Sequence, residues 1–159
     1  MCPLVVLFGQ VTLGIDQFLK QQQPAGVTRV ALIVNQTSVD GQQRSTVKRF
    51  REDIRFDVKI VFAPENSLTG ALYARETIND GKLGDIPVYG ICSTFRNPSR
   101  TLLKDVDAII YDIQCVGCRS HTYTTALFYA MELAAKRSVA FIVLDRPNPC
   151  SWTHSEGFE

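Results

Sequence analysis

The sequence lacks an excess of charge of either sign, a long hydrophobic run and an even set of cysteines. Its 17 basic and 16 acidic side chains leave a net charge of +1. No strong field therefore attracts nucleic acid or an anionic membrane surface, and we expect neither as a partner. The apolar run from Leu4 to Phe8 is too short to span a bilayer, so we predict no membrane span. It also lacks the basic flank and the cleavage pattern of a signal peptide.

The cysteine count bears on the cellular compartment. Five cysteines are an odd number, so at least one thiol stays unpaired within a monomer, which favours a reducing environment. Together with the missing signal peptide, this predicts a cytoplasmic location. With 159 residues the chain is long enough for one domain that buries about two thirds of its unfolded surface without disulfide or metal support.

Apolar runs rich in β-branched residues recur along the chain and alternate with segments of helical character. Because these runs are continuous, without strict polar alternation, we expect strands that are covered on both faces. Strands that alternate with helices predict an α/β fold with a mainly parallel sheet. The expected strands are 30–34, 58–62, 86–91, 106–113 and 139–144, and the expected helices are 14–22, 45–52 and 122–137.

Some local roles follow from the same patterns. Ser45 is expected to cap the second helix, and the last helix is expected to turn one apolar face to the core. The stretch 66–85 contains three glycines and is long for a simple connection, so it is a candidate binding or lid segment. The expected core face of the last helix consists of Leu127, Ala130, Met131 and Ala134.

Polar side chains follow four of the expected strands. In open parallel sheets, ligands bind beyond the carboxyl ends of the strands, because the connecting loops converge there. At any single position a turn or capping role is the commoner explanation, but the coincidence at four strand ends indicates a site for a polyhydroxyl ligand. The four strand ends are 35–37, 64–66, 112–114 and 145–148.

Among the carboxylates at these strand ends, Glu65 is the best candidate for a general acid. It follows an apolar run and Pro64, and partial desolvation there raises a carboxyl pKa towards the range needed to protonate a glycosidic oxygen. Asp112 and Asp145 are expected either to supply a second charge or to tie a loop to a backbone N–H. For Asp145, which precedes Arg146, a structural ion pair or turn cap is the favoured role.

The spacing Cys115-Val-Gly-Cys118 supports a different hypothesis, a thiol oxidoreductase. A cysteine at a helix N-terminus is favoured as thiolate, and Arg119 or His121 could lower its pKa further. A zinc site needs about four ligands, and the remaining cysteines show no second paired spacing. We therefore predict no metal and no cofactor. The structural alternative is that both cysteines are small side chains that fill a turn.

Six segments, in order along most of the chain, resemble the exo-acting β-N-acetylmuramidases of the NamZ type. This family removes N-acetylmuramic acid from the non-reducing ends of peptidoglycan fragments. The last segment, Val143 to Pro149, reproduces the family's V-L-D-R-P-N-P without a change. The other five are Leu13-Gly-Ile-Asp16, Leu32 to Asp40 (LIVNQTSVD), Val61 to Gly70 (VFAPENSLTG), Ile86 to Gly90 (IPVYG) and Asp112 to Tyr123 (DIQCVGCRSHTY).

The resemblance implies a three-layer, Rossmann-like domain over residues 1–149 and a short tail over 150–159, where the family's second region begins. It implies glycoside hydrolysis in peptidoglycan turnover, a saccharide or muropeptide containing N-acetylmuramic acid as the ligand, and an exported or periplasmic location as the alternative to the cytoplasm. Glu65 then corresponds to the catalytic glutamate. The residues implied to line the sugar site are Asn35, Asn66, Asp112, Gln114, Arg119, Thr122, Tyr123, Asp145, Arg146 and Asn148.

The departures from the family pattern fall at the same rim. Asn66 replaces a histidine and cannot shuttle a proton near neutral pH. Cys115 replaces an aspartate, whose negative charge a neutral thiol does not reproduce. The others are Ser67 for a glycine, and Ser120 and His121 for an aromatic pair.

Three hypotheses follow from these departures. The first is a truncated or divergent muramidase-like domain that works with a separate C-terminal domain or chain. The second is a non-catalytic muropeptide-binding or interaction domain, and the third is a thiol oxidoreductase that uses Cys115 and Cys118.

Overall fold

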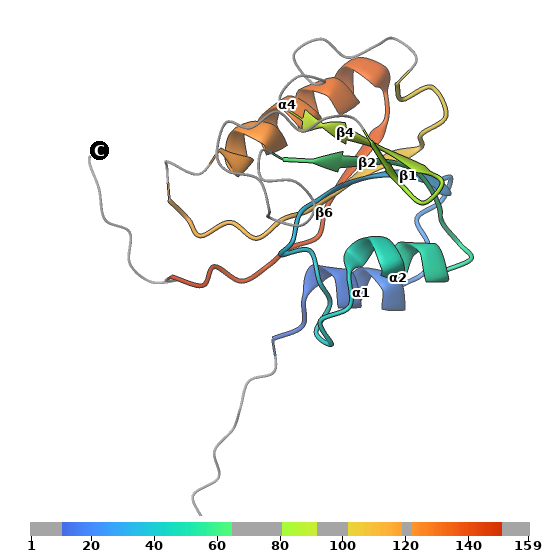
Figure 1. The fold of residues 1–159 in the computed structure, drawn as a ribbon. Helices are drawn as coiled ribbons and strands as arrows, with labels where there is room; N and C mark the ends of the chain where they lie inside the picture. The colour runs from blue at the N-terminus through green and yellow to red at the C-terminus, as the bar shows by residue number, and fades with distance from the viewer. Residues whose placement is uncertain (1–10, 65–80, 92–101, 119–121, 151–159) are drawn as a thin grey trace, which may run out of the picture.

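The computed structural model describes residues 11–64, 81–91, 102–118 and 122–150, and in them a mostly parallel sheet carries helices on both faces (Figure 1). The strand order is β3-β4-β2-β1-β5-β6. The strands are β1 (Arg29–Val34), β2 (Asp57–Ala63), β3 (Gly81–Leu83), β4 (Ile86–Gly90), β5 (Ala108–Asp112) and β6 (Ala140–Val143). The helices are α1 (Gly14–Lys20), α2 (Thr46–Glu52) and α4 (Tyr123–Arg137).

The central strand β1 explains the three layers. Its side chains alternate between two apolar clusters: Val30 and Leu32 belong to the cluster that includes Ile15 and Phe50 of α1 and α2. Ala31 and Ile33 belong to the cluster that includes the buried residues of α4. Both faces of β1 are therefore buried under helices. This confirms the expected α/β fold with a covered, mainly parallel sheet.

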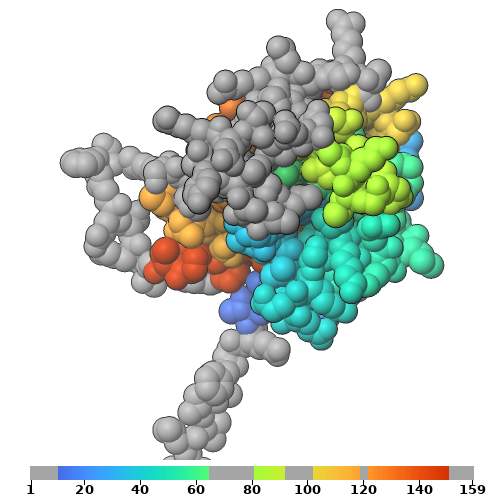
Figure 2. All heavy atoms as spheres, viewed as in Figure 1, coloured from blue at the N-terminus to red at the C-terminus, as the bar shows by residue number. Residues whose placement is uncertain are grey.

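The antiparallel strand β3 differs from the sequence-based expectation. Gly81 to Leu83 pair with β4, although this segment falls in the stretch predicted as a binding or lid element. Gly84 makes the tight turn between the two strands with a positive φ of 67°, which only glycine adopts without strain. The turn region lies against α2, where Arg51 Nη2 donates to Asp85 at 3.1 Å (Figure 2). The remainder of the predicted lid, 66–80, lies outside the described residues.

The sheet edge at β6 is less covered than the sequence suggests. We expected 139–144 to be buried on both faces, but Phe141 and Ile142 are only half-buried and Val143 is 50% exposed. The prediction is wrong because, among the described strands, β6 pairs with β5 alone, whereas a central strand has two neighbours.

Helix α4 turns most of the expected face to the core, because Ala130 and Ala134 are buried and Leu127 packs against the apolar cluster. Met131 is 50% exposed, while the buried residues are Ala126, Ala130, Leu133 and Ala134. Ser45 stands at the N-cap position of α2 as predicted, although its side chain makes no capping hydrogen bond. In the part of the chain that the structure describes, none of the helices is long and apolar enough to cross a membrane.

The strand register sets the position of the site. In the parallel pairing of β1 and β5, Val34 lies opposite Asp112, and in that of β5 and β6, Tyr111 lies opposite Val143. The three strands therefore end at the same level, and the residues that follow them meet at one edge of the sheet.

Helix α1 is fixed to this edge by a close backbone approach. The N–H of Gly14 donates to the carbonyl oxygen of Asp145 at 2.8 Å. A Cβ added at Gly14 would lie 2.3 Å from the Asp145 nitrogen, so no other residue fits without a backbone shift. This contact links the first helix to the loop after β6.

Candidate functional site

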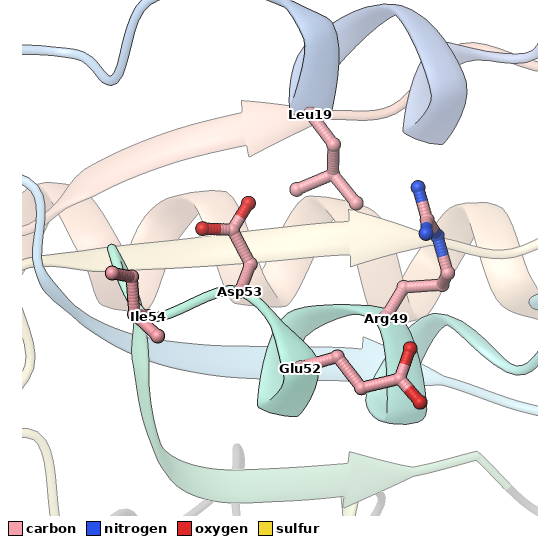
Figure 3. Close-up of a pocket in the computed structure, with 5 residues that line it drawn as sticks. All are labelled: Leu19, Arg49, Glu52, Asp53 and Ile54. Carbon is pink, nitrogen blue, oxygen red and sulfur yellow. The ribbon is translucent and has the colours of Figure 1, made fainter.

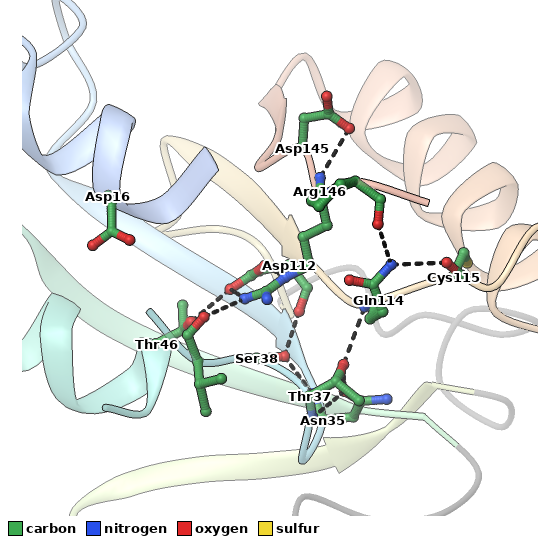
Figure 4. A network of polar contacts seen from close by, with 12 residues as sticks. Asp16, Asn35, Thr37, Ser38, Thr46, Asp112, Gln114, Cys115, Asp145 and Arg146 are labelled. Atoms are coloured by element: carbon green, nitrogen blue, oxygen red, sulfur yellow. Dashed lines mark hydrogen bonds and ion pairs between the residues drawn. The ribbon is translucent and has the colours of Figure 1, made fainter. Parts of the chain in front are cut away.

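A network of polar contacts joins the loops that follow β1, β5 and β6 (Figure 4). Of the residues predicted to line the site, the structure brings Asn35, Asp112, Gln114 and Arg146 into this network. Glu65, Asn66 and Arg119 lie outside the described residues. The hydrogen bonds of this network show which of the predicted side chains hold the loops together and which have groups left for a ligand.

Asp112 and Arg146 form a buried ion pair. The Nε of Arg146 donates to Oδ1 of Asp112 at 2.5 Å, and Nη2 donates to Oδ2 at 2.9 Å. The Asp112 carboxylate also accepts a hydrogen bond from the Thr46 hydroxyl at 2.5 Å and is fully buried. The hydrogen-bonding groups of both side chains are therefore used within the protein. The pair fixes the positions of the loops, and it is not expected to contact a ligand directly.

The same arginine also reaches the loop after β1, because Nη2 of Arg146 donates to the carbonyl oxygen of Val39 at 2.7 Å. Next in that loop, Asp40 is fully buried and paired with Arg44 at 2.8 Å. Burial by itself raises the pKa of Asp40, but backbone N–H groups of Arg44 and Gln42 and the Arg44 guanidinium outweigh it and hold the pKa below its ordinary value. The ion pair and the hydrogen bonds to Asp40 therefore stabilise the conformation of the loop after β1.

Asn35 and Gln114 lie on the other side of the network. Oδ1 of Asn35 accepts hydrogen bonds from the N–H and hydroxyl of Thr37, at 2.9 and 2.6 Å. Thr37 Oγ1 accepts from the N–H of Gln114 at 3.1 Å. The Gln114 amide donates to the carbonyl oxygens of Cys115 and Pro147, at 2.8 and 3.0 Å. Gln114 therefore ties the three loops together.

Asp145 and Asn148 shape the loop after β6. The carboxylate of Asp145 accepts from the N–H of Arg146 at 2.9 Å, which is the turn role favoured from the sequence, although the ion pair of Arg146 is formed with Asp112. The Asn148 side chain accepts from the N–H of Cys150 at 3.0 Å. It also lies against Gly117, where an added Cβ would be 2.6 Å from Nδ2 of Asn148.

The two other predicted residues, Thr122 and Tyr123, stand at the start of α4. Thr122 is exposed and occupies the N-cap position, where its carbonyl oxygen accepts from the N–H of Ala126 at 3.0 Å. The carbonyl oxygen of Tyr123 accepts from the Tyr111 hydroxyl at 3.1 Å. This bond connects the helix start to β5.

The geometry does not favour the thiol oxidoreductase. Burial raises the pKa of Cys115, and the hydrogen bond with the Tyr111 hydroxyl offsets only part of that rise, so the nucleophilic thiolate is disfavoured. Helix α4 begins at Tyr123, so Cys118 does not lie within its first turn. The two cysteines are not joined by a disulfide.

Two buried residues of the network were missed in the sequence. The Ser38 hydroxyl donates to the carbonyl oxygen of Asp112 and accepts from the N–H of Asn35 at 2.9 Å. The Thr46 hydroxyl binds the Asp112 carboxylate. Ser38 directly follows a predicted strand end, which is a weak signal, whereas nothing in the sequence distinguishes Thr46 from a helix-capping residue.

A separate surface cavity of about 310 Å³ lies between α1 and α2 (Figure 3). Helices α1 and α2 both end at this cavity, and the strands that follow them in the chain are β1 and β2. The cavity therefore lies at the amino ends of these strands, whereas the network lies at the carboxyl ends. Its charged residues are paired, for example Asp53 with Arg55 at 2.6 Å. The cavity is lined by Leu19, Arg49, Glu52, Asp53 and Ile54. The described ranges contain no cluster of three or more metal-ligating side chains.

Comparisons with known proteins assign this chain to a family. The family described as "Exo-beta-N-acetylmuramidase NamZ, N-terminal" matches residues 30–159. The chain belongs to the NamZ family. It is 36% identical over 153 residues to the peptidoglycan β-N-acetylmuramidase NamZ of Bacillus subtilis strain 168, a match that covers 93% of this chain and 36% of that protein.

Solved NamZ-like structures show the same fold. A DUF1343 family protein of Bacteroides fragilis superposes with a TM-score of 0.71 at 38% identity, covering 87% of this chain and 35% of that one. A second protein of that family from the same organism gives a TM-score of 0.69 at 27% identity, covering 89% and 36%. The chain therefore spans about a third of the length of the relatives it matches.

The network consists largely of the segments that resemble NamZ motifs. Asn35 and Ser38 belong to 32–40, Asp112 and Gln114 to 112–123, and Arg146 to 143–149. These segments lie far apart in sequence: the residue numbers of Asp112 and Arg146 differ by 34. The tertiary structure therefore brings three NamZ motifs to one edge of the sheet.

Proposed function

We propose that this chain binds the terminal N-acetylmuramic acid of peptidoglycan fragments at the carboxyl edge of its sheet, and that it acts in a glycoside hydrolase of the NamZ type. The observation that carries this proposal is the convergence of three family motifs at the ends of β1, β5 and β6. Ligands bind at this edge in open parallel sheets. Muropeptides of cell-wall turnover are the corresponding ligand class.

In this proposal Glu65 is the general acid. In the sequence it comes shortly after Ala63, the last residue of β2, and β2 pairs with β1. A protonated carboxyl there donates its proton to the glycosidic oxygen as the bond to the leaving group breaks. The described residues supply loops held by the Asp112–Arg146 pair, and a second catalytic group is expected from the part of the family polypeptide that this chain does not span.

Hydrolysis is tested with a chromogenic β-N-acetylmuraminide. The intact chain is assayed alone and together with the C-terminal portion of the related B. subtilis protein, beside Glu65→Gln in each case. We expect turnover in the combined sample and a loss of at least 100-fold in Glu65→Gln. Equal turnover by the two variants contradicts the role of Glu65.

A non-catalytic muropeptide-binding domain is the second candidate. It is favoured by the environment of Cys115, where burial holds the thiol neutral, at a position where the family pattern has an aspartate. The Asp112 carboxylate is fully buried and paired with Arg146, so it is not available as the second catalytic group. Saccharide binding without turnover in every combination identifies this role, and turnover gained by Cys115→Asp shows that the missing carboxylate limits catalysis.

A further inference from the structure

The side-chain nitrogen of Asn35 is a buried donor that the protein itself does not use. Asn35 is 5% exposed, and its Nδ2 has no hydrogen-bond partner within the ranges that the structure describes. A buried donor left unsatisfied destabilises the folded protein, because it has lost its hydrogen bonds to water. A group of this kind in an otherwise well-paired network needs an explanation.

The orientation of the Asn35 carboxamide is fixed by its neighbour. The backbone N–H of Thr37 only donates, so the atom that faces it at 2.9 Å must be the carbonyl oxygen. A flipped amide would place its NH2 group against that N–H. Nδ2 therefore points away from the pair of Asp112 and Arg146, as Figure 4 shows.

Several acceptors of the same network already take hydrogen bonds from other donors. The Ser38 hydroxyl donates to the Asp112 carbonyl, the Asp112 carboxylate takes donors from Arg146 and Thr46, and the carbonyl oxygen of Pro147 accepts from Gln114. Asn35 directly follows the central strand, at the edge where ligands bind. The unpaired donor thus lies beneath the edge at which the saccharide is proposed to bind.

We infer that Nδ2 of Asn35 donates a hydrogen bond to the acetamido carbonyl oxygen of the bound saccharide. The inference rests on the proposed function and names the recognition of the N-acetyl group within it. A donor that is fixed in one orientation and carries no charge matches an oxygen that only accepts, which the amide carbonyl is and a hydroxyl is not. A buried donor of this kind selects strongly against a ligand that lacks the acceptor.

The test is a binding cycle measured by titration calorimetry. The ligands are the methyl β-glycoside of N-acetylmuramic acid and an analogue with hydrogen in place of the acetamido group. The protein variants are Asn35→Asp, which keeps the acceptor for Thr37 and removes the donor, and Gln42→Glu, the same change of charge at an exposed amide. The melting temperature of each variant is recorded alongside.

The intact protein and Gln42→Glu are expected to bind the acetylated ligand roughly tenfold more tightly than the analogue. In Asn35→Asp this preference is expected to disappear. An undiminished preference in Asn35→Asp overturns the inference while leaving the proposed function in place. Binding of neither ligand by the intact protein overturns both.

A measurement on the unaltered protein covers the case in which Asn35→Asp fails to fold. The side-chain NH2 resonances of Asn35 are followed by ¹⁵N–¹H NMR during titration with each ligand. A downfield shift of one NH2 proton with the acetylated ligand alone supports the inference. Equal responses to the two ligands, or none, refute it.

Discussion

Arg146 holds the fully buried carboxylate of Asp112 with two hydrogen bonds, of 2.5 and 2.9 Å, across 34 positions of sequence. The side chain of Arg146 is itself only 6% exposed. The pair fixes the loop after β6 to the end of β5 and, through Val39, to the loop after β1. The edge proposed to bind saccharide is therefore preorganised by a charge pair that lies beneath it.

Removing one partner of this pair should be strongly destabilising. We expect Arg146→Met to lower the free energy of unfolding by about 3–5 kcal/mol, because it leaves the Asp112 carboxylate buried without its cation. The matched control is Lys136→Met, which breaks an exposed pair with Glu132 and should cost less than about 1 kcal/mol. Urea denaturation measures both, and similar losses in the two variants would contradict the structural role of the pair.

Gly14 should tolerate no side chain. Its ideal Cβ position lies 2.3 Å from the backbone nitrogen of Asp145, so Gly14→Ala forces α1 away from the loop after β6, at a cost of about 1–3 kcal/mol. Gly41→Ala is the control, because the nearest atom there is a carboxylate oxygen of Asp16 at 3.1 Å, on a side chain that can move. Thermal unfolding should show the larger loss for Gly14→Ala; the reverse order would refute the close approach.

Asp107 should make stability depend on acid pH. Hydrogen bonds from the Arg29 side chain, then from the Arg29 backbone N–H, hold its pKa well below the ordinary value. A lowered folded-state pKa contributes stability above the unfolded pKa of about 3.9, and this stability is lost as pH falls through the folded-state pKa. The melting temperature should therefore fall on acidification below about pH 4, and fall less in Asp107→Asn.

The control for this acid dependence is Asp85→Asn, whose carboxylate is 82% exposed and pairs with Arg51 at the surface. It should retain the acid dependence of the unaltered protein. Melting curves recorded between about pH 6 and pH 2 make the comparison. An unchanged slope in Asp107→Asn would show that other carboxylates govern acid unfolding.

The thiols should differ in reactivity. Burial raises the pKa of Cys115, so little thiolate forms near neutral pH and alkylation should be slow. Cys150 is exposed and should react at least several times faster with iodoacetamide at pH 7.5, as measured by mass spectrometry of the labelled peptides. Preferential labelling of Cys115 would restore the thiol oxidoreductase as a serious hypothesis.

The general architecture was predictable because it depends on local pattern. Continuous apolar runs identified five of the strands, and periodicity together with turn residues identified the described helices. The antiparallel β3 was not predicted, because Gly81 to Leu83 are exposed and carry no apolar pattern. The exposure of Val143 was also missed, since position at the edge of a sheet depends on strand order and not on composition.

The candidate site was predictable only as a set of positions. The sequence identified Asn35, Asp112, Gln114 and Arg146 because each lies at or shortly after the end of a strand, within a family motif. It could not show that Asp112 pairs with Arg146 in place of Asp145, because that choice depends on which loops lie opposite each other. Glu65, Asn66 and Arg119 remain predictions.

The sequence by itself determined the family, the alternation of strands and helices, and the edge of the sheet at which polar residues gather. Motifs and hydrophobic runs are local properties, so they can be read in order along the chain. Only the tertiary structure decided which polar groups are occupied and which are free. Hydrogen bonds such as those of Thr46, Asp112 and Arg146 join distant segments, and only their geometry leaves Nδ2 of Asn35 as the buried donor without a partner in the described network.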